Sequence, residues 1–387
     1  MKGKLPINPD ILIWARESAN LLKEDVASKM NKSPDTIAAW ERGDSSPTYI
    51  QLETLAYTVF KRPIAIFFFP EPPKEMDPKG SFRTLPESEI QELPPTFLRL
   101  FRRAQAMQIN LEELNEGVNP APKKILRDIV FAPNSNVRDM VKDIREYIGV
   151  SINTQTGWRD TETALREWRN IIEENGVFVF KDSFRLDDIS GFCIYDDEFP
   201  VIYANNTMPK TRQIFTLFHE LTHLLLRTGG IDMKNNDAFL RRIKGGNKRA
   251  EVLCNHFAGA FLVPDSDLDK IMPNVEINDE GINQLANRYK VSREVILRKW
   301  FDRHLISREY YEQKTAEWIE EAKRRRTVNA EGGDYYNNVA AYLGDHYLDL
   351  VFTKYYQGRF SAEQMAEYLG VKVSNVPGLE AAFLGRS

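Results

Sequence analysis

The spacing of hydrophobic and polar positions predicts a chain made mostly of helices. Apolar residues recur every three or four positions across residues 8–66, which indicates several short helices. The same spacing predicts helices at 97–114, 137–148 and 161–174, and helical patterning again from Pro209 onward. Most of the chain is therefore expected to be helical.

The spacing of apolar residues changes in one central stretch of the chain, from residue 176 to residue 204. Gly176–Phe180, Ile189–Tyr195 and Val201–Ala204 are short apolar runs typical of strands, and Asp196 and Asp197 mark a turn between the last two. We therefore predict an α+β, mostly helical fold in which a small antiparallel sheet packs on the helix that follows Pro209.

Changes in composition divide the chain further. Seven prolines lie between Pro70 and Pro95, which is typical of a linker or an irregular arm. The expected organisation is a helical bundle at 1–70, a proline-rich linker at 71–96, a helical connector at 97–175, a sheet-containing domain with a helical extension at 176–306, and a C-terminal helical region at 307–387.

Composition and charge exclude several classes of protein. The formal net charge of -4 excludes a broadly basic nucleic-acid coat, although a local basic patch is compatible with it. Two cysteines, Cys193 and Cys254, are too few for a disulfide framework or a four-cysteine zinc module. The longest apolar run, Ile64–Phe69, is far shorter than the roughly 20 residues of a membrane helix. We expect a soluble, cytoplasmic protein without membrane contact.

The most specific chemical signal is the motif His219-Glu220-Leu221-Thr222-His223. Residues four apart on a helix lie on one face, about 6 Å apart along the axis, so two imidazoles can converge on one metal ion. Glu220 lies beside them, where a carboxylate can reach water at the metal. The motif predicts metal-assisted hydrolysis.

A catalytic zinc ion needs a third protein ligand. Glu251 is the acidic residue that the next predicted helix offers before Pro264, and Asn255 follows it by one turn and could orient a ligand. His256 is about 140° from Glu251 around the helix, so the two cannot both face one ion. Cys254 is an alternative ligand, although a small buried cysteine is the commoner case.

Four pieces of this region resemble the ImmA/IrrE family of metallo-endopeptidases. They are Gly191–Tyr195, Val201–Asn205, Arg212–Leu226 and Glu251–Pro264. The resemblance implies peptide hydrolysis with zinc held by His219, His223 and Glu251 and with Glu220 as the base and proton shuttle. Two imidazoles and a carboxylate suit Zn²⁺ and are also compatible with Mn²⁺.

Two features of the expected reaction are left open by the residues. Tyr203, Arg212 and His256 are candidates for stabilising the oxyanion. The predicted strand Val201–Ala204 is a candidate for pairing with an extended peptide substrate.

Residues Leu21–Gly43 resemble the Xre-type helix-turn-helix. The resemblance implies a recognition helix at Ser33–Ala39. Side chains expected to face bases are Ser33, Asp35, Thr36 and Ala38, and those expected near phosphates are Lys29, Lys32 and Arg42. Residues 1–75 carry ten Lys or Arg and ten Asp or Glu, so few cations are available to neutralise phosphates. Binding of promoter DNA and docking to a protein are equally weighted predictions for this segment.

The leading functional hypothesis is a zinc endopeptidase that cleaves a specific regulator protein and so controls transcription, a toxin–antitoxin pair or a mobile-element switch. The alternative is a non-catalytic antitoxin or transcriptional regulator that holds a toxin partner. A metal-dependent sensor is a third. The intact set of His219, Glu220, His223 and Glu251 favours the enzyme, because a binding protein has no need of a general base. An oligomer is compatible with each hypothesis.

Overall fold

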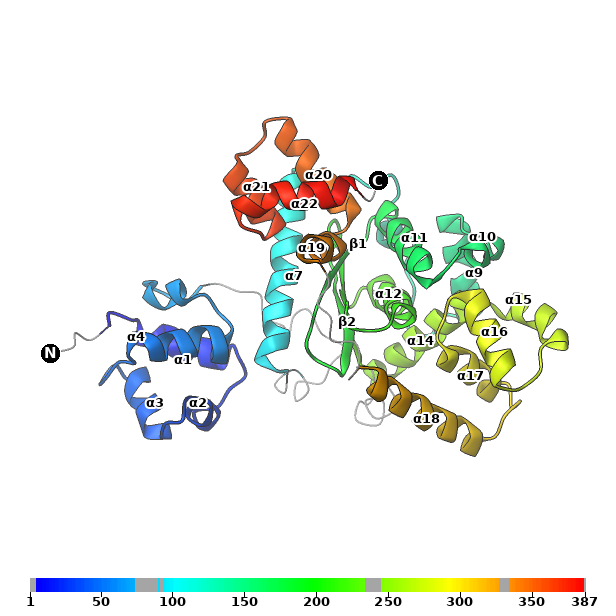
Figure 1. The fold of residues 1–387 in the computed structure, drawn as a ribbon, viewed down its shortest axis with the longest axis horizontal. Coiled ribbons are helices and arrows are strands. Elements are labelled where there is room, and N and C mark those ends of the chain that lie inside the picture. Colours follow the sequence, from blue (N-terminus) through cyan, green and yellow to red (C-terminus); the bar gives the residue numbers. More distant parts are fainter. Residues whose placement is uncertain (1–4, 74–89, 91–92, 234–244, 327–333, 386–387) are drawn as a thin grey trace. The chain divides into compact units, whose positions relative to one another are not determined.

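A computed structural model describes residues 5–73, 90, 93–233, 245–326 and 334–385. The chain forms two compact units, one of residues 1–105 with 184–186 and one of residues 106–183 and 187–387. Helix α7 (Pro95–Leu114) begins in the first unit and ends in the second (Figure 1). Most of the predicted linker at 71–96 lies outside the described residues. The finer domain boundaries stay predictions.

The N-terminal unit is a bundle of short helices. Its elements are α1 (Pro9–Glu17), α2 (Lys23–Met30), α3 (Pro34–Glu41), α4 (Tyr49–Glu53), the π-helical turn η1 (Thr54–Phe60) and the 3₁₀ turn η2 (Ile64–Phe68). Asn8, Ser33 and Thr48 cap α1, α3 and α4 with their side-chain oxygens, which explains where these helices begin. Apolar side chains from all the helices enclose one core, and within it Arg16 and Glu41 form a buried ion pair at 2.6 Å between α1 and α3.

The second unit carries the sheet and the remaining helices. Up to the sheet it comprises α8 (Ile125–Asp128), α9 (Val137–Ile148), α10 (Ile152–Gly157) and α11 (Thr161–Glu174). The strands are β1 (Phe178–Asp182), β2 (Ile189–Ile194), β3 (Val201–Asn205) and β4 (Gly230–Met233). After β3 come α12 (Lys210–Leu225), α14 (Gly245–Leu262), α15 (Asp265–Ile271), η3 (Met272–Asn274), α16 (Asp279–Tyr289), α17 (Arg293–Asp302) and α18 (Arg308–Arg326).

The chain ends in a further group of helices. They are α19 (Tyr335–Leu343), α20 (Asp345–Tyr356), α21 (Ala362–Leu369), η4 (Val373–Asn375) and α22 (Val376–Leu384). The α+β, mostly helical class is thus confirmed. No helix in the described part of the chain is both long and apolar enough to cross a membrane.

The sheet differs from the prediction in two respects. Its order is β1-β3-β2-β4, and β1 pairs with β3 in parallel, so the sheet is mixed and not wholly antiparallel. The parallel pair arises because β3 inserts between β1 and β2 after forming a hairpin with β2. Strand β4 was not predicted, because it is four residues long and begins at the second of two glycines. It is too short for an alternating pattern to be visible.

Helix α12 is the central element behind the sheet. Val179, Cys193 and Ile202 project from three strands into the core that α12 shares with α11 and α14. Phe180 and Tyr203 project from the opposite face, where Phe180 packs against Tyr347 of α20. Because α12 is covered by strands on one side and helices on others, most of its side chains are buried, including those of the metal motif.

Candidate metal centre

The histidine motif lies in the second half of α12, and its imidazoles face one another. The Nε2 atoms of His219 and His223 are 3.2 Å apart, and both side chains are fully buried. The preceding apolar positions of α12 pack into the core, so the helix presents both histidines to α14. The four-residue spacing therefore produces the convergence expected of it.

Glu251 of α14 completes the cluster. Its Oε1 is 3.2 Å from His223 Nε2, and its Oε2 is 3.5 Å from His219 Nε2. One possible ligand atom from each of the three residues lies within 4.8 Å of the others. Cys254 does not belong to this group among the described residues, so the geometry favours Glu251 over Cys254 as the third ligand.

These residues fit a tetrahedral ion such as zinc. Zn–N and Zn–O bonds of about 2.0–2.2 Å at tetrahedral angles separate neighbouring ligand atoms by about 3.3–3.6 Å, close to the distances found here. Oε1 of Glu251 is buried without a hydrogen-bond partner. Burial alone would raise the pKa of Glu251, but the imidazoles of His223 and His219 outweigh it and bring this pKa down to about 2. A carboxylate held ionised beside two imidazoles is the donor set that a divalent metal requires.

Two neighbouring side chains orient the imidazoles. Asn255 donates from Nδ2 to the carbonyl of Glu251 at 2.9 Å, which turns its Oδ1 toward His219 Nδ1 at 3.2 Å. Thr228 donates to the carbonyl of His223 at 3.0 Å and lies 3.5 Å from His223 Nδ1. A proton held on each Nδ1 leaves each Nε2 lone pair directed into the cluster.

Glu220 is fully buried next to the cluster. Both of its carboxylate oxygens are buried without a hydrogen-bond partner of good geometry, although the thiol of Cys193 interacts with the carboxyl. Burial raises the pKa of Glu220 to about 8, with the carboxylates of Asp232 and Glu251 acting in the same direction and His223 opposing them. Such a group can exchange a proton near neutral pH.

The sequence predicted no role at the metal centre for Asp232 of β4. Asp232 is fully buried and accepts hydrogen bonds from Arg212 at 2.6 Å and Thr216 at 2.7 Å. Burial acts against protonation of His219, but the Asp232 carboxylate, followed by Glu251, raises the pKa of His219. In the sequence, Asp232 is visible only as an acidic residue shortly after the motif helix. Its role becomes recognisable only when the pairing of β4 with β2 is known.

The structure shows where the candidates for stabilising the oxyanion and for pairing with the substrate lie. Tyr203 faces the side of the sheet away from α12, beside Phe180 and Phe192, so it cannot reach the metal cluster. Arg212 is paired with Asp232, and His256 is exposed on α14. Strand β3 lies between β1 and β2, so the prediction that Val201–Ala204 pairs with a substrate is wrong, because both of its edges are already occupied.

The side chains predicted to contact DNA are mostly exposed on the N-terminal unit. Lys29, Lys32, Ser33, Asp35 and Arg42 are exposed. Thr36 and Ala38 are half-buried on α3. The Ser33 hydroxyl caps α3 by accepting from the Thr36 amide, and Arg42 forms an exposed ion pair with Asp44 at 2.8 Å. Their roles in binding DNA stay predictions.

Comparison with known proteins supports both regions. Residues 172–301, which contain the sheet, α12 and α14, match the family model of the IrrE N-terminal-like domain. Residues 12–56 match the helix-turn-helix family. The resemblance to the two families is confirmed.

The chain also aligns with a curated protein. It is 34% identical over 101 residues to the radiation response metalloprotease IrrE of Deinococcus deserti. The alignment covers 25% of this chain and 34% of that protein, so the chain spans about a third of its relative's length. The histidine cluster, Glu220 and Glu251 all lie inside the IrrE-like region, while α3 lies inside the helix-turn-helix match.

Proposed function

We propose that this chain is a metal-dependent endopeptidase, with zinc as its metal, that cleaves a specific regulator protein in the cytoplasm. The observation that carries the proposal is the placement of Glu220 beside the converging atoms of His219, His223 and Glu251. Three protein ligands with an adjacent buried carboxylate are what metal-assisted hydrolysis requires. The match of residues 172–301 to the IrrE N-terminal-like domain and the similarity to a metalloprotease support the same class.

Zinc, when bound, lowers the pKa of water and polarises the scissile carbonyl. His219, His223 and Glu251 hold it, and Asn255 keeps the imidazole of His219 in the required orientation. Glu220 takes a proton from the attacking water on its carboxylate and passes it to the nitrogen of the leaving amine. Its position supports this role, because Glu220 is buried beside the ligand cluster, where a carboxylate can reach water at the metal.

An extended substrate requires a free strand edge near this centre. The edges of the described sheet are β1 and β4, and Gly230 of β4 contacts the imidazole of His223. We infer that a peptide adds to β4 as a further strand, in place of the β3 pairing first expected. The substrate is inferred to be one regulator of transcription, because the chain also carries a helix-turn-helix region able to bring it to promoter DNA.

Glu220→Gln tests hydrolysis separately from metal binding. The variant is expected to keep its metal and to lose cleavage, whereas Glu251→Ala is expected to lose the metal. New protein N-termini would be compared in cells of the source organism expressing wild type or Glu220→Gln. A few termini in one regulator that require Glu220 would support the proposal, and equal metal content in Glu251→Ala would remove Glu251 from the ligand set.

The complete burial of the centre favours a second candidate. His219, Glu220 and His223 have no exposed surface and Glu251 is 1% exposed, as in a structural metal site. On this alternative the protein is an antitoxin or transcriptional regulator that holds a toxin partner without cleaving it. A stoichiometric partner complex that is indifferent to Glu220→Gln, with no Glu220-dependent termini, would favour it.

A further inference from the structure

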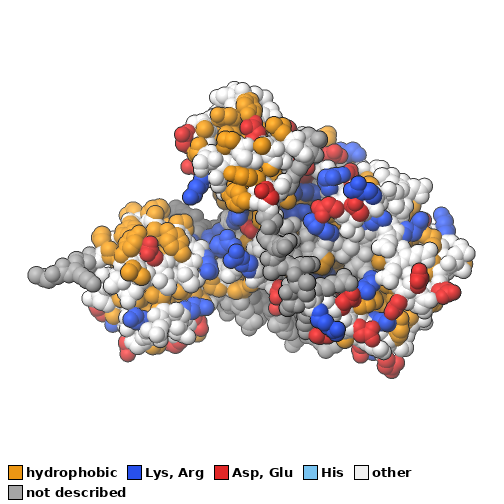
Figure 2. All heavy atoms as spheres, viewed as in Figure 1, with side chains coloured by type: hydrophobic (Ala, Val, Ile, Leu, Met, Phe, Trp, Pro, Cys, Tyr) orange, Lys and Arg blue, Asp and Glu red, His pale blue; other side chains and the backbone are white. Residues whose placement is uncertain are grey.

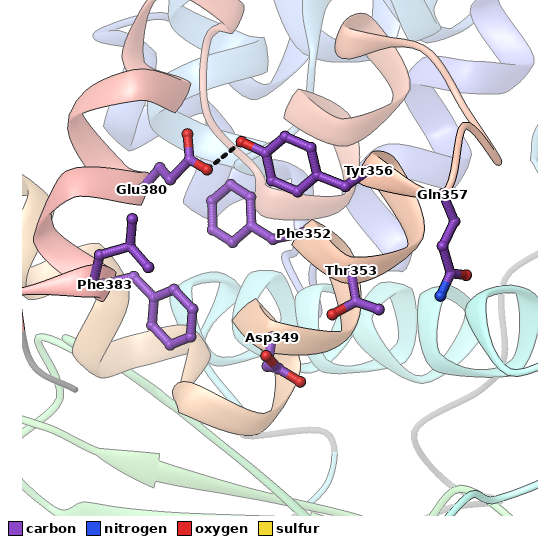
Figure 3. A pocket seen from close by; sticks show the side chains of 8 residues that line it. Asp349, Phe352, Thr353, Tyr356, Gln357, Glu380 and Phe383 are labelled. Atoms are coloured by element: carbon purple, nitrogen blue, oxygen red, sulfur yellow. Dashed lines mark hydrogen bonds between the residues drawn. The ribbon is translucent and has the colours of Figure 1, made fainter.

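A groove separates two helices at the end of the chain. It has a volume of about 430 Å³ and lies between α20 and α22. Phe352 and Phe383 form its apolar centre with parallel rings 5.9 Å apart, and the Tyr356 hydroxyl donates to the carboxylate of Glu380 from the opposite helix. Figure 3 shows Phe352, Tyr356 and Glu380 meeting between the two helices, with Thr353 and Asp349 along the α20 side.

The spacing of the lining residues matches the surface that receives a helix. On α20 they are Asp349, Phe352, Thr353, Tyr356 and Gln357, at positions i, i+3, i+4, i+7 and i+8. On α22 they are Glu380, Phe383 and Leu384, at i, i+3 and i+4. Such a pattern usually turns a helix face toward a packing partner.

Part of this face is apolar and exposed, although Phe352 itself is only 5% exposed. Tyr356 is 67% exposed and Leu384 is 63% exposed, and Figure 2 shows hydrophobic side chains gathered over the C-terminal helices. Contiguous exposed apolar surface with a polar border marks interaction sites in soluble proteins. A third helix laid between α20 and α22 would cover these side chains and complete a three-helix arrangement.

The charge of the groove restricts what that helix can carry. The lining includes two carboxylates, Asp349 and Glu380, two hydroxyls and an amide, but no lysine, arginine or histidine. The Tyr356 hydroxyl binds one oxygen of Glu380 and leaves the other for a second donor. Aromatic faces beside carboxylates suit the methylene stem and charged end of arginine or lysine.

We propose that the groove between α20 and α22 binds an amphipathic helix of another protein, with apolar residues at i, i+3 or i+4, and i+7, and an arginine or lysine that pairs with Glu380. The apolar stripe lies on Phe383, Tyr356 and Leu384, as in other helix-in-groove complexes. This site goes beyond the function proposed above and requires neither hydrolysis nor DNA binding.

Photo-crosslinking tests the occupant. The full chain with p-benzoylphenylalanine at position 353 is expressed in cells of the source organism, and crosslinked peptides are mapped by mass spectrometry. The expected product joins position 353 to a segment of a different protein that has the stated apolar spacing and a neighbouring cation. Glu380→Lys is expected to reduce its yield about tenfold or more, while Glu363→Lys, an equal charge change on α21 outside the lining, leaves it unchanged.

The mapped segment then serves as a synthetic peptide for fluorescence anisotropy with the full chain. Glu380→Lys is expected to weaken binding about tenfold, and replacing the peptide's cation by glutamate is expected to restore binding to that variant. Asp349→Lys provides a second variant if Glu380→Lys lowers the melting temperature. Crosslinks only to another copy of this chain or to its own residues, crosslinks unaffected by both variants, or no crosslink would each overturn the proposal.

Discussion

At the scale of single residues, Gly230 controls the position of His223. A Cβ atom at this position would lie 2.4 Å from Cδ2 and 2.7 Å from Nε2 of the imidazole, closer than real contacts allow. The strand β4 is held in place by pairing with β2, so the imidazole would have to move. The glycine is therefore needed for close approach of the strand to the metal cluster.

Gly230→Ala is expected to lower metal affinity about 10–100-fold, the range typical when a residue that orients a metal ligand is lost. Metal content after competition with a chelating dye would measure the change. Gly259→Ala on α14 is the matched control, because a Cβ there meets no atom within 4 Å and alanine is favoured in a helix. Equal affinity of the two variants would show that the imidazole can move without cost.

The sequence predicts some of these residues and not others for a simple reason. His219 and His223 are placed together by local helix geometry, which four-residue spacing reveals directly. Glu251 could be predicted because it is the acidic residue on the next helix and because the family resemblance supports it. Gly230 and Asp232 gain their meaning only from the pairing of β4 with β2, which no local pattern encodes.

At the scale of elements, one arginine ties α19 to the rest of the second unit. Arg169 of α11 donates to the carbonyls of Ala341 and Leu343, both at 2.8 Å, near the end of α19. These carbonyls belong to the last turn of α19, where backbone carbonyls have no hydrogen-bond donor within their own helix. Arg169 also donates to the carbonyl of Val179 on β1 and pairs with buried Glu173 at 3.2 Å. One guanidinium thus joins a helix, a strand and a second helix.

Arg169→Met is expected to destabilise the second unit by about 3–5 kcal/mol, because it leaves the buried carboxyl of Glu173 unpaired. Urea unfolding would measure the loss, and faster amide exchange in α19 would localise it. Arg166→Met is the control, since Arg166 is exposed on the same helix and pairs only at the surface with Glu167. Unchanged exchange in α19 would contradict the proposed anchoring role.

Elements with local start and stop signals were the most predictable. The predicted bounds of α9 and α11 are those found, because Asn136 and Asp160 cap their first turns and Gly149 ends α9 in a left-handed conformation. Sheet order was less predictable. The interior position of β3 and its parallel pairing with β1 depend on contacts between strands, and these are set by packing on α12 and not by the residues of β3 alone.

At the scale of the whole molecule, the two compact units carry different chemistry. The metal cluster lies entirely in the second unit, and the predicted DNA-contacting residues lie entirely in the first. Residues 1–75 carry equal numbers of cations and acids and so have few cations for phosphate. Each exposed lysine near α3 therefore contributes a large share of any electrostatic affinity. Lys29 and Lys32 are the exposed cations on which this prediction depends.

Lys29→Ala and Lys32→Ala are each expected to weaken binding to a duplex from the chain's own promoter and to lower the slope of log affinity against log salt by about 1. Anisotropy titrations between about 50 and 200 mM salt would measure this. Lys372→Ala, an equal charge change at an exposed site in the second unit, is expected to leave the slope unchanged, and all three variants are expected to keep the metal content of wild type. Binding that is insensitive to salt would contradict the DNA role and favour docking of the first unit to a protein, since phosphate neutralisation is the source of affinity that these lysines can supply.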